Sequence, residues 1–206
     1  MKIKICGLNP TRDVQICIDL NIDFLGFVFY NKSPRNTDLK EISVLKKYNP
    51  KTSHYVSVCV NPTDEFLQKN ILGNFDYIQL HGSETFERVK EIKKMGIKVV
   101  KVIKVKEQKN IAVYKDYENI ADLILFDSTS MEKSQSIPKD LLRKLPKGEK
   151  FGLAGAINLE NIQEYSQLGF NFLDISSGLE RENLKGYKDH LKIKNFMNKI
   201  NELKNK

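Results

Sequence analysis

Short apolar runs recur along the chain, and a polar segment follows each of them. Their content of Val, Ile, Leu and Phe is typical of strands. Most are apolar at nearly every position rather than at alternate positions, which favours strands covered on both faces, as in a parallel sheet. The eight predicted strands are KIKIC (2–6), FLGFVF (24–29), YVSVCV (55–60), YIQLHG (77–82), KVVKVIKV (98–105), DLILFDS (122–128), FGLAGAI (151–157) and NFLDISSG (171–178).

The segments between these strands have helical spacing. Val14, Cys17 and Ile18 fall at i, i+3 and i+4 after the first strand. Asn61, Pro62 and Thr63 form a cap-like start of the helix after the third strand. Ser83 is a candidate N-cap of the helix after the fourth strand. The C-terminal segment is predicted to pack an apolar helical stripe against the sheet, formed by Ile193, Phe196, Met197, Ile200 and Leu203.

Eight alternating strand and helix units predict one closed (β/α)₈ TIM barrel. We expect residues 1–206 to form a single domain, and 206 residues lies at the small end of the usual size range of this fold. A doubly wound open sheet is the alternative. Against it, no GxGxxG follows the first strand, and no acidic residue occupies the position that a dinucleotide ribose needs.

The charge of the chain suggests an anionic partner. It has 34 Lys and Arg against 26 Asp and Glu, a formal net charge of +8. Such a charge could steer a phosphorylated metabolite or a nucleic acid, although a solvated lysine-rich surface is the simpler interpretation. No run approaches the roughly 18 to 20 apolar residues of a membrane span, so we expect no membrane association.

The cysteines and histidines give no sign of a disulfide framework or a metal site. Cys6, Cys17 and Cys59 are widely separated, and no signal-peptide-like segment is present, which favours the reducing cytoplasm. No CxxC or HxxxH spacing occurs. From the sequence we expect neither a metal nor a cofactor.

Polar and titratable residues gather at the C-terminal ends of the predicted strands, where barrel enzymes place their active sites. These are Cys6, Arg35, His81 and Asp127. Taken singly, each has a structural interpretation, such as a small core thiol, a solvent-facing cation or a loop hydrogen bond. Their shared position at one end of the barrel favours a functional site.

The last two strands point to a phosphorylated ligand. Gly155 in LAGAI, and Ser176 and Ser177 in DISSG, place small residues where backbone amides can approach an anion. In barrels this is the common phosphate site.

Motifs along nearly the whole chain carry a resemblance to a known family. They are KICGL, GFVF followed by SPR, QLHG, LFDS, LAGAINLENI, DISSGLE and KGYKD. In this order they resemble phosphoribosylanthranilate isomerase of tryptophan biosynthesis. The resemblance implies a (β/α)₈ barrel and a cofactor-independent Amadori rearrangement of N-(5-phosphoribosyl)anthranilate to 1-(2-carboxyphenylamino)-1-deoxyribulose 5-phosphate.

Carried over by motif, the resemblance implies Cys6 as the general base and Asp127 as the general acid. It also implies that Arg35 holds the anthranilate carboxylate and that His81 and Asp174 orient the sugar hydroxyls and the anilino nitrogen. The phosphate would rest on backbone amides around Gly155, Ala156, Ser176 and Ser177.

Two positions depart from the family pattern. Ala156 stands where members usually have a second glycine, and a methyl group there could narrow the approach to the phosphate. The stretch STSMEKSQSIPKD (128–140) lacks the glycine-rich sequence typical of the sixth loop. We expect a working enzyme with altered loop contacts and closure.

Two other functions remain open at the level of sequence. The related histidine-pathway isomerase performs the same type of rearrangement, but it would be expected to carry an acidic residue in place of Cys6. A basic nucleic-acid-binding protein is suggested by KEIKKMGIKVVKVIKVK, yet no aromatic residues interleave with these cations. We therefore expect a phosphorylated small-molecule substrate and no nucleic-acid partner. We also expect a monomer rather than a homodimer.

Overall fold

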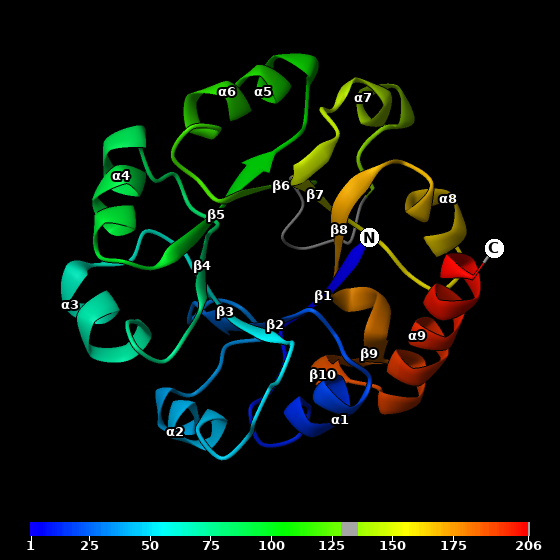
Figure 1. The fold of residues 1–206 in the computed structure, drawn as a ribbon, viewed down its shortest axis with the longest axis horizontal. Helices are drawn as coiled ribbons and strands as arrows, with labels where there is room; N and C mark the ends of the chain where they lie inside the picture. Colours follow the sequence, from blue (N-terminus) through cyan, green and yellow to red (C-terminus); the bar gives the residue numbers. More distant parts are fainter. Residues whose placement is uncertain (129–135, 206) are drawn as a thin grey trace.

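A computed structural model describes residues 1–128 and 136–205, and its centre is a closed barrel of eight parallel strands. Figure 1 looks along the barrel, with the helices arranged as a ring around the strands. The strands are β1 (Lys2–Cys6), β2 (Phe24–Phe29), β3 (His54–Cys59), β4 (Tyr77–Leu80), β5 (Lys98–Lys104), β6 (Leu123–Asp127), β7 (Gly148–Ala154) and β8 (Phe170–Ile175).

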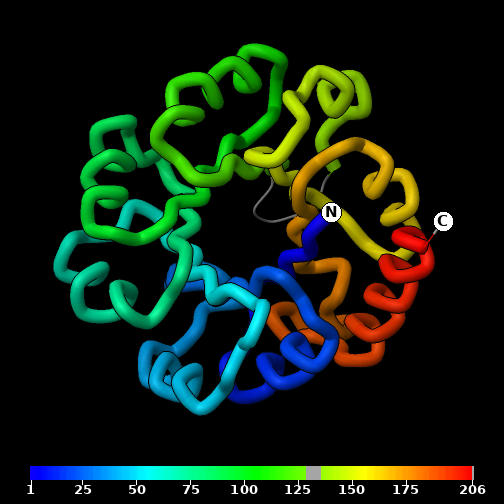
Figure 2. Tube along the Cα trace, in the orientation of Figure 1, coloured from blue at the N-terminus to red at the C-terminus, as the bar shows by residue number. Residues whose placement is uncertain are grey.

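Pairing of the first and last strands closes the barrel. Ile5 on β1 lies opposite Ile175 on β8, and Cys6 lies opposite Gly26 on β2. The predicted (β/α)₈ fold is therefore confirmed, and the alternative open sheet is wrong. The tube trace in Figure 2 shows the same closed course of the chain.

The helical segments lie outside the barrel. Most are short, and the C-terminal α9 is the longest described. They are α1 (Val14–Asp19), the 3₁₀ segment η1 (Leu39–Glu41), α2 (Ile42–Leu45), α3 (Asp64–Phe66), the π-helical η2 (Leu67–Ile71), α4 (Phe86–Lys94), α5 (Gln108–Ala112), α6 (Tyr114–Tyr117), α7 (Lys139–Lys144), α8 (Ile162–Ser166), the 3₁₀ segment η3 (Ser177–Leu179) and α9 (His190–Lys204).

The core has two parts because alternate residues of each strand face the barrel interior and the helices. The outer part joins strands to helices, and the predicted stripe on α9 contributes Ile193, Phe196, Met197 and Ile200 to it. In the interior, the ring centroids of Phe24 and Phe172 lie 5.6 Å apart. Apolar side chains thus fill one end of the interior and leave the other for polar groups.

A hairpin that the sequence interpretation did not predict follows β8. It consists of β9 (Glu180–Arg181) and β10 (Leu184–Lys188). Gly186 has a φ of +85°, and a Cβ there would lie 2.3 Å from the carbonyl oxygen of Pro34. The hairpin therefore packs closely on the loop that follows β2.

Candidate functional site

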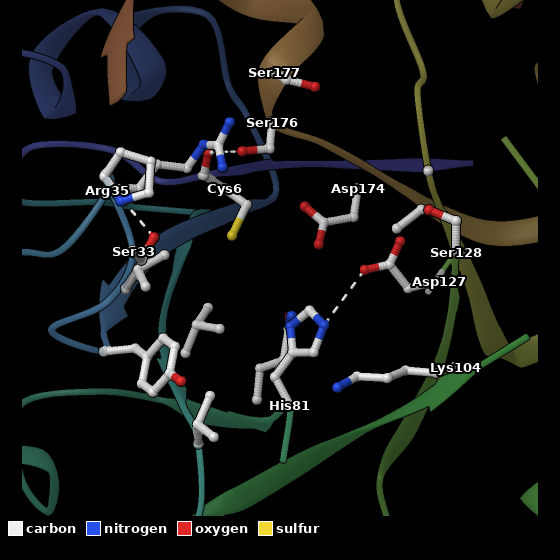
Figure 3. Close-up of a pocket in the computed structure, with 18 of the residues that line it drawn as sticks. Cys6, Ser33, Arg35, His81, Lys104, Asp127, Ser128, Asp174, Ser176 and Ser177 are labelled. Atoms are coloured by element: carbon white, nitrogen blue, oxygen red, sulfur yellow. Dashed lines mark hydrogen bonds and ion pairs between the residues drawn. The ribbon is translucent and has the colours of Figure 1, made fainter. Parts of the chain in front are cut away.

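A cavity of about 810 Å³ opens at the C-terminal ends of the strands. Every residue that the sequence analysis singled out as a site candidate lines it: Cys6, Arg35, His81, Asp127, Gly155, Ala156, Asp174, Ser176 and Ser177. Figure 3 shows the titratable members of this set around one space, with Asp174 between Cys6 and Asp127 in this view. The predicted clustering at one barrel end is a feature of the structure.

Cys6 ends β1 with its side chain on the interior face. The residue is only 8% exposed, and burial raises the pKa of its thiol. Asp174 acts in the same direction, whereas the ammonium groups of Lys4 and Lys188 act to lower that pKa. The two lysines therefore favour the thiolate in a site that otherwise favours the thiol.

Asp127 and His81 form a pair across the cavity. His81 Nε2 lies 3.4 Å from Asp127 Oδ2. Burial, followed by the charge of Asp174, raises the pKa of Asp127 to about 7. Burial, followed by the charge of Lys104, lowers the pKa of His81 to about 4. Between these values the proton resides on the carboxyl group, and the imidazole is neutral.

Asp174 offers an acceptor to the cavity. Its Oδ2 accepts a hydrogen bond of 2.8 Å from Lys4 Nζ. Its Oδ1 is buried and has no hydrogen-bond partner among the described residues. An unpaired buried carboxylate oxygen is costly, so a ligand that donates a hydrogen bond there gains affinity.

The guanidinium of Arg35 is held by an acid that the sequence analysis did not select. Arg35 Nε and Nη2 donate to Glu180 Oε1 and Oε2 at 2.5 and 3.0 Å. Lys188 Nζ also lies 3.4 Å from Glu180 Oε1 and donates to the carbonyl oxygen of Ser176 at 3.0 Å. Arg35 thus lines the cavity, but its charge is paired in the ligand-free protein.

The candidate phosphate-binding residues lie on the loops after β7 and β8. Gly155 and Ala156 both have positive φ angles, +106° and +52°. Ser176 Oγ donates to the carbonyl oxygen of Cys6 at 3.0 Å, which ties the β8 loop to the end of β1. Within the glycine-poor stretch 128–140, residues 129–135 lie outside the described part of the chain.

Several charged residues of the site were missed by the sequence analysis. Lys32, Lys104 and Lys185 line the cavity and are exposed at its rim. In a chain with 34 Lys and Arg, no local signal separates these three from surface lysines. Lys4 had a usable signal, because it is a charged residue two positions before Cys6 and therefore on the same strand face.

Residues 1–128 and 136–205 hold no group of three or more His, Cys, Asp or Glu placed to bind a metal ion. They also include no helix that is both long and apolar enough to cross a membrane.

A family model and a curated relative agree on the family of this chain. The family model described as N-(5'phosphoribosyl)anthranilate (PRA) isomerase matches residues 3–199. The N-(5'-phosphoribosyl)anthranilate isomerase of Aquifex aeolicus is 35% identical, over 96% of this chain and 97% of its own length.

Two solved structures add to this result. One, described as mutually generated monomers of the dimeric phosphoribosylanthranilate isomerase from Thermotoga maritima, has a TM-score of 0.80 at 25% identity, covering 98% of this chain and 99% of that one. The other is a phosphoribosyl anthranilate isomerase in complex with reduced 1-(o-carboxyphenylamino)-1-deoxyribulose 5-phosphate, with a TM-score of 0.79 at 26% identity and 96% coverage of both chains.

Proposed function

Because the chain belongs to the N-(5'-phosphoribosyl)anthranilate isomerase family, we propose that Cys6 and Asp127 carry out the base and acid steps of the family reaction. The enzyme is an isomerase of tryptophan biosynthesis that performs the Amadori rearrangement. The assignment rests on one observation. A cysteine from β1 and an aspartic acid from β6, the latter with a pKa of about 7, face the same cavity.

Asp127 supplies the proton that opens the ribose ring. The carboxyl group protonates the ring oxygen as the bond between C1 and this oxygen breaks, and the anilino nitrogen donates its lone pair to form an iminium ion. A carboxyl with its ordinary pKa would be ionised at neutral pH, whereas the raised pKa of Asp127 keeps part of the population protonated. The neutral imidazole of His81, with its Nε2 3.4 Å from Asp127 Oδ2, lies beside this carboxyl and helps to orient it.

Cys6 then removes a proton from C2. The thiolate takes the proton, the electron pair of the C2–H bond forms the C1=C2 double bond, and the iminium nitrogen becomes neutral. The resulting enolamine tautomerises to the ketose. In this last step C1 gains a proton and the C2 hydroxyl loses one, so that the thiolate of Cys6 and the protonated carboxyl of Asp127 are restored for the next turnover.

The remaining cavity residues bind the substrate. Asp174 Oδ1 lacks a partner among the described residues, so it accepts a hydrogen bond from a sugar hydroxyl or from the anilino N–H. Arg35 binds the anthranilate carboxylate by sharing its guanidinium between this group and Glu180. The phosphate is held by the loops containing Gly155, Ala156, Ser176 and Ser177.

The proposal extends to how the chain is organised. We propose that residues 1–206 form one domain and that the protein is a monomer of the cytoplasm, where its cysteines stay reduced. Exposed large apolar side chains are spread over several helical segments, as for Leu39, Phe86 and Leu191. Light scattering should return the mass of one chain, whereas twice that mass would contradict the monomer.

The catalytic roles are tested by steady-state kinetics with purified variants. Cys6→Ala and Asp127→Asn should each lower kcat by at least about a hundredfold while the circular dichroism spectrum is unchanged. Cys59→Ala is the matched control, because Cys59 is buried at the end of β3 and does not line the cavity. Near-normal turnover by either site variant would refute its role, and turnover of the histidine-pathway substrate alone would refute the function.

A further inference from the structure

Lys4 is the feature of the site that the mechanism above leaves unexplained. It lies on β1, two residues before Cys6, so both side chains face the interior of the barrel. Lys4 is 1% exposed and is one of the largest fully buried side chains of the described residues. An ammonium in such a place is costly and requires compensating charge.

The contacts of Lys4 place its charge between two groups of the cavity. Its Nζ donates to Asp174 Oδ2 at 2.8 Å. A Cβ at Gly26, which is opposite Cys6 in the β1–β2 register, would lie 3.1 Å from Lys4 Nζ and 3.2 Å from Cys6 Sγ. The ammonium and the thiol thus converge over the one position of β2 that has no side chain.

The ion pair keeps Lys4 charged. Burial alone would lower the pKa of Lys4, but Asp174 and Cys6 outweigh burial and raise it. The charged groups that act on Cys6 are Lys4, then Asp174, then Lys188, and the effect of Lys4 exceeds the opposing effect of Asp174. The pair as a whole therefore favours a negative charge on sulfur.

We propose that Lys4 is a positioning residue whose buried ammonium, anchored by Asp174, stabilises the thiolate of Cys6, and that Gly26 keeps open the space in which the two groups meet. This proposal rests on the assignment of Cys6 as the base. Lys4 transfers no proton itself. When Cys6 takes the C2 proton, the negative charge on sulfur disappears and Lys4 remains paired with Asp174, so the same contact is ready for the next turnover.

The first test measures the thiol without substrate, so that its outcome does not depend on the catalytic assignment. The rate of alkylation of Cys6 by iodoacetamide is followed from pH 6 to 10 by mass spectrometry. Lys4→Met should lower the rate at pH 8 by about tenfold or more, because each unit of increase in the thiol pKa removes nine-tenths of the thiolate. An unchanged alkylation profile in folded Lys4→Met would overturn the proposal.

A second buried lysine provides the matched control. Lys101 Nζ lies 2.7 Å from Glu84 Oε2. Lys101 stands between Val100 and Val102, whose side chains face the barrel interior, so its own side chain lies on the outer side of β5. Lys101→Met also removes a buried ammonium from an ion pair, but it should leave the alkylation profile of Cys6 unchanged. An equal loss of Cys6 reactivity in both variants would assign the effect to general loosening of the barrel and refute the role of Lys4.

Two further measurements separate this role from a merely structural one. In Lys4→Met, the upper limb of the pH profile of kcat/KM should move to higher pH by the same amount as the thiol titration. If the variant does not fold, wild-type protein with ¹⁵N-labelled lysine serves instead. The ¹⁵N chemical shift of Lys4 Nζ should then change with pH at the pKa of Cys6, and this change should be absent in Cys6→Ser. A Lys4 chemical shift with the same pH dependence in both proteins would overturn the proposal.

Discussion

At the residue scale, burial raises the pKa of both titrating groups of the site and leaves Asp127 the more acidic of the two. Burial raises the pKa of the Cys6 thiol above its ordinary value and raises that of Asp127 to about 7. The reaction needs the thiolate together with the protonated carboxyl. Above pH 7 both groups change in opposite senses, because the protonated fraction of Asp127 falls as the thiolate fraction of Cys6 rises.

This order predicts the shape of the pH profile of kcat/KM. The rate constant should rise about tenfold per pH unit up to pH 7 and then stay level until the pH reaches the pKa of the thiol. The lower limb reports Asp127, since an aspartic acid of ordinary pKa would extend the level region down to about pH 4. Stopped assays from pH 4.5 to 10 can measure this, and a level profile between pH 4.5 and 7 would contradict the raised pKa.

Ala156 carries a second residue-scale prediction. Its φ of +52° lies in the left-handed region, which costs alanine about 1 kcal/mol or more relative to glycine. Ala156→Gly should raise the free energy of unfolding by roughly 0.5 kcal/mol, because the greater freedom of glycine in the unfolded chain offsets part of the gain.

Urea denaturation measures the difference at position 156, and the adjacent glycine gives the opposite control. Gly155→Ala places a side chain at a φ of +106° and should destabilise the fold. A destabilised Ala156→Gly would show that the methyl group makes a favourable contact in this turn.

At the element scale, the packing of β7 on β8 depends on a missing side chain. A Cβ at Gly152 would lie 2.2 Å from the ring of Phe172, which is buried against Phe24. Gly152→Ala should therefore lower the free energy of unfolding by about 2 kcal/mol or more, because the buried ring or the strand must shift to admit the methyl group.

Gly73→Ala is the control that separates the steric cost of an added methyl group from the cost of backbone strain. Gly73 has a φ of +78°, but among the described residues no heavy atom beyond its two chain neighbours lies within 4 Å of the position of a Cβ there. Its substitution should cost about 1 kcal/mol through backbone strain alone. Equal losses in the two variants, measured by urea denaturation, would contradict the steric argument for Gly152.

The strands were predictable from sequence, whereas the ends of the helices were only partly so. All eight strands are confirmed within a few residues, because continuous apolar runs are a strong local signal. Within the predicted cap-like start Asn61, Pro62 and Thr63, it is Thr63 that accepts a hydrogen bond from the amide of Phe66. The prediction for Ser83 is wrong, because Thr85 caps α4 by accepting from the amide of Arg88, and a turn containing Gly82 and Glu84 precedes it.

At the scale of the whole molecule, the barrel and the site candidates could be read from the sequence, but the charge pairs could not. Lys4 meets Asp174 across a separation of 170 residues, and Arg35 meets Glu180 across 145. Closure of the barrel brings β1 beside β8 and creates the first pair, and the packing of the β9–β10 hairpin on the loop after β2 creates the second. Glu180 and Lys188 lie on the β9–β10 hairpin, which has no alternation of apolar and polar residues from which it could be predicted. Leu184, Lys185 and Tyr187 of this hairpin are all exposed.

The distribution of charge over the molecule leads to a last prediction, on ionic strength. The substrate carries a phosphate and a carboxylate, and the cavity rim presents Lys32, Lys104 and Lys185 on a chain of formal net charge +8. Exposed charges act over about 8 to 10 Å at physiological salt, so added salt should screen this attraction. We expect kcat/KM to fall roughly threefold or more between 20 mM and 500 mM KCl, with kcat less affected.

The position of the rim lysines, rather than net charge, should set this dependence. Replacing Lys32, Lys104 and Lys185 with Gln should lower kcat/KM at low salt and flatten its salt dependence. The matched control replaces Lys90, Lys94 and Lys194 with Gln. These three lysines are also exposed but do not line the cavity, and their replacement removes the same charge. If the two triple variants respond alike, the attraction comes from the overall charge of the molecule, and the rim has no special part in capturing the substrate.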